Sequence, residues 1–219
     1  MESEQITHGA EEVKGSFNLK KEVFEWFYTI VIALLIVGII KCFLFDLVVV
    51  DRPSMFPTLV DGDRLVVTRL GYEPHSQDII VLDSNYKDRG EYYAENDIDG
   101  IARFTEYFKL PKDLKRRYYV KRIIGMPGQV VDIVDGKVTV DGEELSEPYY
   151  KGETFGYDSN VEFPVTVDDD SVFVMGDNRP QSKDSRSSEL GQVPIKAIMG
   201  KCSLRIWPIN KLGNPDVTE

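Results

Sequence analysis

The chain of 219 residues carries a formal net charge of −11, and 42% of its residues are hydrophobic. This hydrophobic fraction supports a folded core and excludes wholesale disorder. The negative charge argues against nucleic acid as a partner, because phosphate binding relies on clusters of lysine and arginine. Two cysteines and two histidines supply neither a disulfide scaffold nor a metal site at recognisable spacing, so we expect no metal and no cofactor.

The first element in chain order is a long apolar segment, which we predict to be a transmembrane helix over residues 24–45. The stretch from Trp26 to Phe45 contains one charged residue, Lys41, about one helical turn from its far end. There the ammonium group can reach the lipid headgroups. Twenty helical residues span about 30 Å, which is the thickness of the hydrocarbon core of a bilayer.

Three other interpretations of this segment fit the sequence less well. A cleaved signal peptide would need an Ala-x-Ala site, and lipid attachment at Cys42 would need small residues before the cysteine; neither is present. A buried helix in a soluble domain would be long for such an apolar run. Residues 1–23 are predicted to form a cytoplasmic tail. Three lysines precede the helix and two basic residues follow it closely. By the positive-inside rule, this difference of one positive charge slightly favours a cytoplasmic N-terminus.

Residues 46–219 contain eight short segments with the composition of β-strands, and turn signals separate them. Asp135-Gly136 joins two of these segments and is a strong hairpin signal. We therefore predict one extracytoplasmic domain with a mostly β fold of short antiparallel strands. The predicted strands are 47–50, 64–68, 78–82, 118–125, 130–134, 137–140, 161–167 and 171–175.

Two parts of this domain differ in character from the rest. Residues 84–117 are charged and rich in Tyr and Asp, and Ala102 to Phe108 could form a short helix. We expect this stretch to be a surface insertion rather than a separate domain. Residues 129–170 are expected to form a smaller hairpin-rich region.

Ser54 is the first candidate for chemistry, because Pro53 and Pro57 constrain the loop around it. On composition alone, a serine between prolines is more typical of a simple turn. Lys121 is the second candidate. A lysine on a strand is normally solvated, but burial lowers its pKa from about 10.4 towards neutrality. A neutral amine can act as a general base.

Four motifs in this order resemble the type I signal peptidase family, membrane-bound Ser/Lys endopeptidases that remove signal peptides from exported proteins. The resemblance covers about residues 24 to 208. The motifs are Ser54 to Leu59, Gly62 to Leu65, Lys121 to Gly128 and Gly176 to Arg186. The third motif contains a lysine-arginine pair, and the fourth contains a dense run of polar side chains.

The resemblance implies a role for each matching residue. Ser54 would be the nucleophile, Lys121 the general base, and Ser182 the serine that hydrogen-bonds and orients the lysine. Charged residues would brace the site through ion pairs, and Met55 would lie beside the substrate-binding groove. The bracing residues are Asp177, Asp184, Arg186 and Arg122.

One position departs from the family pattern. The backbone N–H of Ser54 is the expected oxyanion donor. A second donor can come from a serine two residues earlier, and related Gram-positive enzymes usually have glycine there. This chain has Arg52, which leaves the second donor open.

The resemblance also implies substrates and a location. The substrates would be precursor proteins with signal peptides, cleaved after small residues. The enzyme would cross the cell membrane once, contact lipid and act near the secretion translocase. The alternative is an inactive or regulatory membrane-tethered paralogue that binds peptides. A repressor-type Ser/Lys protease is disfavoured by the apolar segment and the acidic charge. An endoplasmic-reticulum-type enzyme is disfavoured because it has histidine at the position of Lys121.

Overall fold

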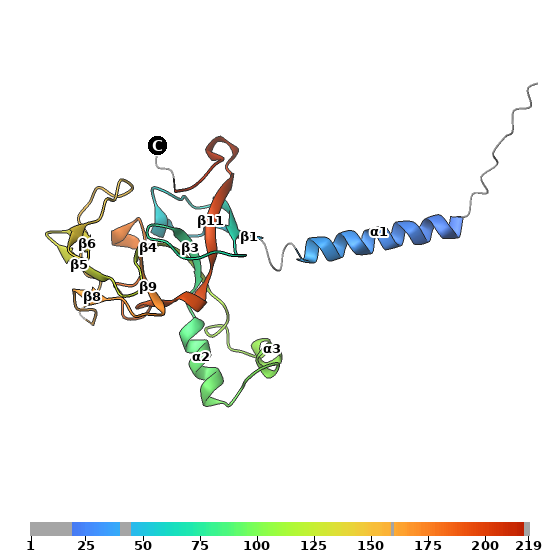
Figure 1. The fold of residues 1–219 in the computed structure, drawn as a ribbon, viewed down its shortest axis with the longest axis horizontal. Helices are drawn as coiled ribbons and strands as arrows, with labels where there is room; N and C mark the ends of the chain where they lie inside the picture. Colours follow the sequence, from blue (N-terminus) through green and yellow to red (C-terminus); the bar gives the residue numbers. More distant parts are fainter. Residues whose placement is uncertain (1–18, 40–44, 159, 217–219) are drawn as a thin grey trace, which may run out of the picture. The chain divides into compact units, whose positions relative to one another are not determined.

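The computed structural model describes residues 19–39, 45–158 and 160–216, and the chain divides into two compact units, Met1–Ile40 and Lys41–Glu219. The first unit contains helix α1 (Leu19–Ile39), which begins before the predicted start at residue 24 (Figure 1). Among the residues described, no helix combines the length and the apolarity needed to cross a membrane. Residues 40–44 of the predicted span, and 1–18 of the predicted tail, lie outside the described residues.

The second unit is built on a seven-stranded sheet with the order β1-β2-β11-β3-β4-β9-β10, in which every pair is antiparallel. The predicted mostly β fold with antiparallel strands is therefore confirmed. Its strands are β1 (Phe45–Val49), β2 (Arg64–Thr68), β3 (Ile79–Asp83), β4 (Tyr118–Gly125), β9 (Ser171–Met175), β10 (Val193–Pro194) and β11 (Ile198–Trp207).

The centre of this sheet is buried on both faces. Ile79 and Val81 of β3 belong to one hydrophobic cluster, while Ile80 and Leu82 belong to another. A strand covered on both faces needs apolar residues at every position, which explains its unbroken apolar run. β1, at the sheet edge, alternates between exposed and half-buried residues instead.

The smaller sheet has the order β7-β6-β5-β8 (Figure 1). Its strands are β5 (Val130–Val134), β6 (Lys137–Val140), β7 (Glu143–Glu144) and β8 (Val165–Thr166). Asp135 and Gly136 both have positive φ angles, as the tight hairpin turn between β5 and β6 requires. The predicted strand 161–167 is largely irregular and only 165–166 pairs. Pro164 lacks the N–H that a strand ladder needs.

Residues 84–117 connect β3 to β4 and contain α2 (Tyr86–Glu95) and α3 (Ala102–Tyr107), together at one end of the unit (Figure 1). α3 matches the predicted helix, whereas α2 was not predicted. Buried Asp83 at the end of β3 forms an ion pair with Arg89 of α2 and fixes this connection to the sheet. Short 3-10 helices complete the unit: η2 (Pro53–Met55), η3 (Arg179–Gln181), η4 (Ile195–Ala197) and η5 (Ile209–Lys211).

Candidate active site

Ser54 lies in η2, five residues after the end of the edge strand β1, and the fold fixes both of its neighbours. Met55 is 1% exposed and packs in the core cluster that includes Val50 and Leu59. On the other side, the amide side chain of Asn178 donates to the Pro53 carbonyl at 3.0 Å, and its backbone N–H donates to the Ser54 carbonyl at 3.0 Å. The serine is thus held in one position rather than in a flexible turn.

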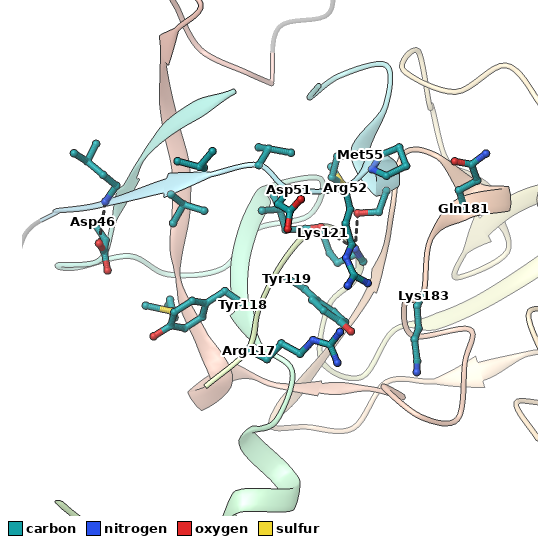
Figure 2. Close-up of a pocket in the computed structure, with 18 residues that line it drawn as sticks. Asp46, Asp51, Arg52, Met55, Arg117, Tyr118, Tyr119, Lys121, Gln181 and Lys183 are labelled. Atoms are coloured by element: carbon teal, nitrogen blue, oxygen red, sulfur yellow. Dashed lines mark hydrogen bonds between the residues drawn. The ribbon is translucent and has the colours of Figure 1, made fainter. Parts of the chain in front are cut away.

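Lys121 of β4 meets Ser54 across 67 residues of sequence. Its Nζ donates to Ser54 Oγ at 2.9 Å and to the Val120 carbonyl at 3.0 Å (Figure 2). The lysine is 3% exposed, and its Nζ lies 5.2 Å from the centre of the Tyr119 ring. The structure therefore brings together the two residues that the sequence predicted as nucleophile and base.

Burial lowers the pKa of Lys121 to about 8, because the charged ammonium loses its solvation. Attraction from Asp184 and Asp177 opposes this shift, whereas repulsion from Arg52 and Arg186 adds to it. A lysine with this pKa is partly neutral near physiological pH. Its nitrogen lone pair can then accept the proton of the hydroxyl 2.9 Å away.

Ser182 is fully buried. A Cβ atom on Gly176 would lie 2.1 Å from Ser182 Oγ and 2.4 Å from the Ser54 carbonyl oxygen, so both serines approach this glycine closely. However, Ser182 Oγ has no hydrogen-bond partner among the described residues. The bond from Ser182 to Lys121 implied by the resemblance is not formed here: Lys121 Nζ donates to Ser54 Oγ and the Val120 carbonyl instead.

Two buried ion pairs flank the site, and they involve the four predicted bracing residues. Arg122 donates to both carboxylate oxygens of Asp177, at 2.9 and 2.7 Å, and Thr58 donates to the same carboxylate at 2.5 Å. Arg186 donates to both oxygens of Asp184 at 2.9 Å. Bidentate pairing satisfies charges that would be costly to bury alone.

These pairs also hold the loops around Ser54 and Lys121. Asp177 connects β4, through Arg122, to the helix-turn segment after Ser54, through Thr58. Asp184 accepts a hydrogen bond from the Gly176 N–H at 3.0 Å, which fixes the glycine against Ser54 and Ser182. Their positions follow from the sheet, since Arg122 of β4 lies opposite Met175 at the end of β9.

Several residues of the site were not predicted individually: Thr58, Gly176, Asn178 and Arg179. All four lie within the family motifs, so their position there was the available signal. Arg179 is buried and pairs with Glu147, and its Nε donates to the Gly176 carbonyl at 3.1 Å. Met55 lines the pocket described below, but its near-complete burial makes it mainly a core anchor for Ser54.

A pocket of about 530 Å³ opens beside Ser54 and Lys121 (Figure 2). Strand β1 and its continuation to Met55 form one side, and residues 117–121 form another. Within the described residues, β1 pairs with β2 alone, and β4 begins to pair with β9 only at Arg122. Both strand edges along the pocket therefore have unused backbone donors and acceptors. Within the described part of the chain, no group of three or more His, Cys, Asp or Glu side chains is placed to hold a metal.

Comparison with known proteins identifies the family. Residues 23–207 match the family described as signal peptidase, peptidase S26. A signal peptidase I of Bacillus licheniformis is 33% identical over 210 residues, which cover 92% of this chain and 97% of that protein. One from Bacillus amyloliquefaciens is 34% identical over 205 residues, with coverages of 91% and 96%.

Among solved structures, the crystal structure of a signal peptidase I from Enterococcus faecalis V583 is 26% identical. Its TM-score is 0.40, with 59% of this chain and 97% of that chain covered. The sequence matches span most of the chain and include all four motifs. The chain therefore belongs to the signal peptidase family, peptidase S26, as its motifs predicted.

Proposed function

We propose that Ser54 and Lys121 are the nucleophile and the general base with which this member of the signal peptidase family removes signal peptides from exported proteins. The observation that carries the proposal is the 2.9 Å contact between Lys121 Nζ and Ser54 Oγ, made by a lysine that is 3% exposed. An ordinary solvated lysine would be protonated at neutral pH and could not take the proton.

The reaction follows from these two groups. Neutral Lys121 takes the hydroxyl proton as Ser54 Oγ attacks the scissile carbonyl, and the backbone N–H of Ser54 stabilises the resulting oxyanion. The ammonium then protonates the leaving amine, which releases the mature protein and leaves an acyl-enzyme. Lys121 next deprotonates a water molecule, whose attack on the ester frees the signal peptide and restores Ser54.

The supporting residues act on the geometry of this pair. The Arg122–Asp177 and Arg186–Asp184 ion pairs brace the segments that position Ser54 and Gly176. Ser182 lies against Gly176 with an unpartnered hydroxyl. We propose that Ser182 orients Lys121. When the lysine is neutral and its lone pair accepts from Ser54 Oγ, one of its N–H groups would donate to Ser182 Oγ.

An extended substrate fits the free edges of β1 and of residues 118–121. A peptide laid between them would form backbone hydrogen bonds to both, with alternate side chains directed into the pocket. The substrates would be precursor proteins cleaved after small residues, in keeping with the family. The apolar wall formed by Val48, Val50 and Met199 suits small aliphatic side chains.

We further propose that residues 24–45 anchor the enzyme in the cell membrane, with residues 1–23 in the cytoplasm and 46–219 outside it. The stretch from Trp26 to Phe45, with its single charge, supports an anchor, as do the exposed apolar side chains along α1. Ser54 follows nine residues after Phe45, so the site would act close to the lipid surface. There it would meet precursors that emerge from the secretion translocase.

Cleavage of a reporter precursor by purified variants tests the assignment. Ser54→Ala and Lys121→Ala should each abolish processing and keep the wild-type circular dichroism spectrum. Exposed Ser146→Ala and Lys137→Ala serve as matched controls and should cleave normally. Full processing by either site variant would refute the mechanism. If wild type binds the precursor without cleaving it, the alternative of a peptide-binding paralogue is correct.

A further inference from the structure

The pocket beside Ser54 contains three cationic side chains in addition to Lys121, although the chain as a whole has a net charge of −11. They are Arg52, Arg117 and Lys183, which come from three separate segments. Figure 2 shows the Arg52 and Arg117 side chains extending towards the Tyr119 ring, while Lys183 lies apart from that ring, below Gln181 in the view. A local concentration of positive charge on an acidic protein indicates recognition of a negative group.

Two of these cations have no acidic partner in the protein. Among the described residues, neither the Arg52 guanidinium nor the Arg117 guanidinium has a carboxylate oxygen within 4.0 Å, although the backbone N–H of Arg117 donates to Asp83 at 3.2 Å. The Arg117 guanidinium lies 5.6 Å from the centre of the Tyr119 ring, and Lys183 pairs with exposed Glu189. Free guanidinium groups at a pocket wall are suited to bind a carboxylate of the substrate.

The pocket also contains two carboxylates, which do not cancel this charge. Asp46 lies at the left end of the view in Figure 2, away from Lys121, and its carboxylate is 3.8 Å from Arg69. Asp51 is exposed and makes no ion pair within the described residues. Among the described residues, the pocket therefore holds one unpaired carboxylate, Asp51, against the two unpaired guanidinium groups, and it keeps a net positive charge.

The backbone of Arg52 supplies an independent observation. Its φ of 133° and ψ of 151° fall in a region that glycine occupies without strain and other residues rarely adopt. Glycine would therefore suit this position better for stability. What arginine adds is a guanidinium two residues before the nucleophile, which points to a functional reason for its presence.

We propose that Arg52, Arg117 and Lys183 form a cationic wall that selects precursors with an acidic side chain within three residues of the scissile bond. The inference rests on the proposed Ser54–Lys121 site, because that site defines where the bond lies. In an extended peptide, alternate side chains point the same way, so one or two substrate positions would face the wall. The ligand is the carboxylate of an aspartate or glutamate residue in a peptide.

Paired peptides test this proposal. Each of the three positions on either side of the scissile bond carries Asp in one peptide and isosteric Asn in the other, assayed in detergent free of anionic lipid. The readout is the ratio of kcat/KM for the Asp peptide to that for the Asn peptide. Any effect of Arg52 on Lys121 changes both rates alike and cancels in this ratio.

Wild type should favour Asp at one or two positions by about two- to tenfold, the range for one or two partly exposed ion pairs. Arg52→Ala, Arg117→Ala and Lys183→Ala should each move the ratio towards one, and Arg52→Lys should keep most of it. Arg103→Ala is the matched control, because exposed Arg103 lies against Tyr93 and not in the pocket. Its ratio should equal that of wild type.

A ratio of one or less at every position would overturn the inference, as would ratios that none of the three alanine variants changes. A preference for Asp that appears only when anionic vesicles are added would also overturn it, since the cations would then act on lipid. Failure of the proposed function looks different, because wild type would then cleave neither peptide of a pair.

Discussion

Lys121 and Arg122 are adjacent on β4, and each is 3% exposed, but their surroundings shift their pKa values in opposite directions. Arg122 has a bidentate carboxylate partner, Asp177, whereas Lys121 contacts a hydroxyl and a carbonyl. Burial lowers the pKa of Arg122, but the hydrogen bonds and charge of Asp177 outweigh burial and raise it overall. Burial dominates at Lys121, and its pKa falls to about 8.

The comparison teaches that burial alone does not decide what a cation does in this protein. A strand directs neighbouring residues to opposite faces, so two adjacent cations meet different partners. On one face the charge is kept and braces the fold. On the other face the charge is easily lost, which is what a general base requires.

The largest expected effect on activity comes from replacing Lys121 by arginine, the residue at the neighbouring position 122. Lys121→Arg keeps a cation near Ser54 but removes the ability to become neutral, because a guanidinium stays protonated. We expect kcat/KM for a reporter precursor to fall by about 10²- to 10⁴-fold, the usual contribution of a general base. Near-normal cleavage by this variant would show that Lys121 does not act as a base.

Replacing each cation by an apolar residue should change stability in opposite directions. Arg122→Met leaves buried Asp177 unpaired and should lower the free energy of unfolding by about 3–5 kcal/mol. Lys121→Met removes a poorly solvated amine and should raise it by about 1–3 kcal/mol. Urea unfolding of the two variants at pH 7 measures both. If both substitutions changed the free energy of unfolding in the same direction, the contrast between Lys121 and Arg122 would be wrong.

The pH dependence should report the neutral form of Lys121. Because the base is active when deprotonated, kcat/KM should increase with pH, with the midpoint of the increase near 8. Well below this pH, it should change about tenfold per pH unit. A flat profile between pH 6 and 9 would exclude Lys121 as the titrating base.

The same pKa predicts how stability depends on pH. Between the folded pKa of Lys121 and the usual lysine pKa, the unfolded state binds more protons than the folded state. Stability should therefore increase as pH rises from about 8 to 10.4.

The smallest effect is expected at Arg52, whose charge adds to the lowering of the Lys121 pKa. Arg52→Gly should move the midpoint of the pH profile upward, because it removes a repelling cation. The same substitution should raise the free energy of unfolding by about 1 kcal/mol, since glycine adopts this backbone conformation without strain. A downward shift of the midpoint would contradict the electrostatic role of Arg52, and Arg103→Ala again serves as the control.

The strands that the sequence predicted well are those whose pattern is local. Five of them, β2, β4, β5, β6 and β9, have the predicted bounds. β11 was missed, although it lies at the middle of the large sheet between β2 and β3. Its pattern is interrupted by register shifts, and Gly200 packs so closely that a Cβ atom would lie 2.2 Å from the Thr68 carbonyl. Such a strand is recognisable only from its partners.

The sequence by itself determined the family, the mostly β class and the identity of the candidate nucleophile and base, because these depend on motifs and short-range patterns. Only the tertiary structure decided that Ser54 and Lys121 meet at 2.9 Å, that Ser182 Oγ lies close to Gly176 without a hydrogen bond to the lysine, and that Arg52 and Arg117 share a pocket. The physical reason is that burial and partners set the charge of a lysine, and both arise from segments far apart in the chain.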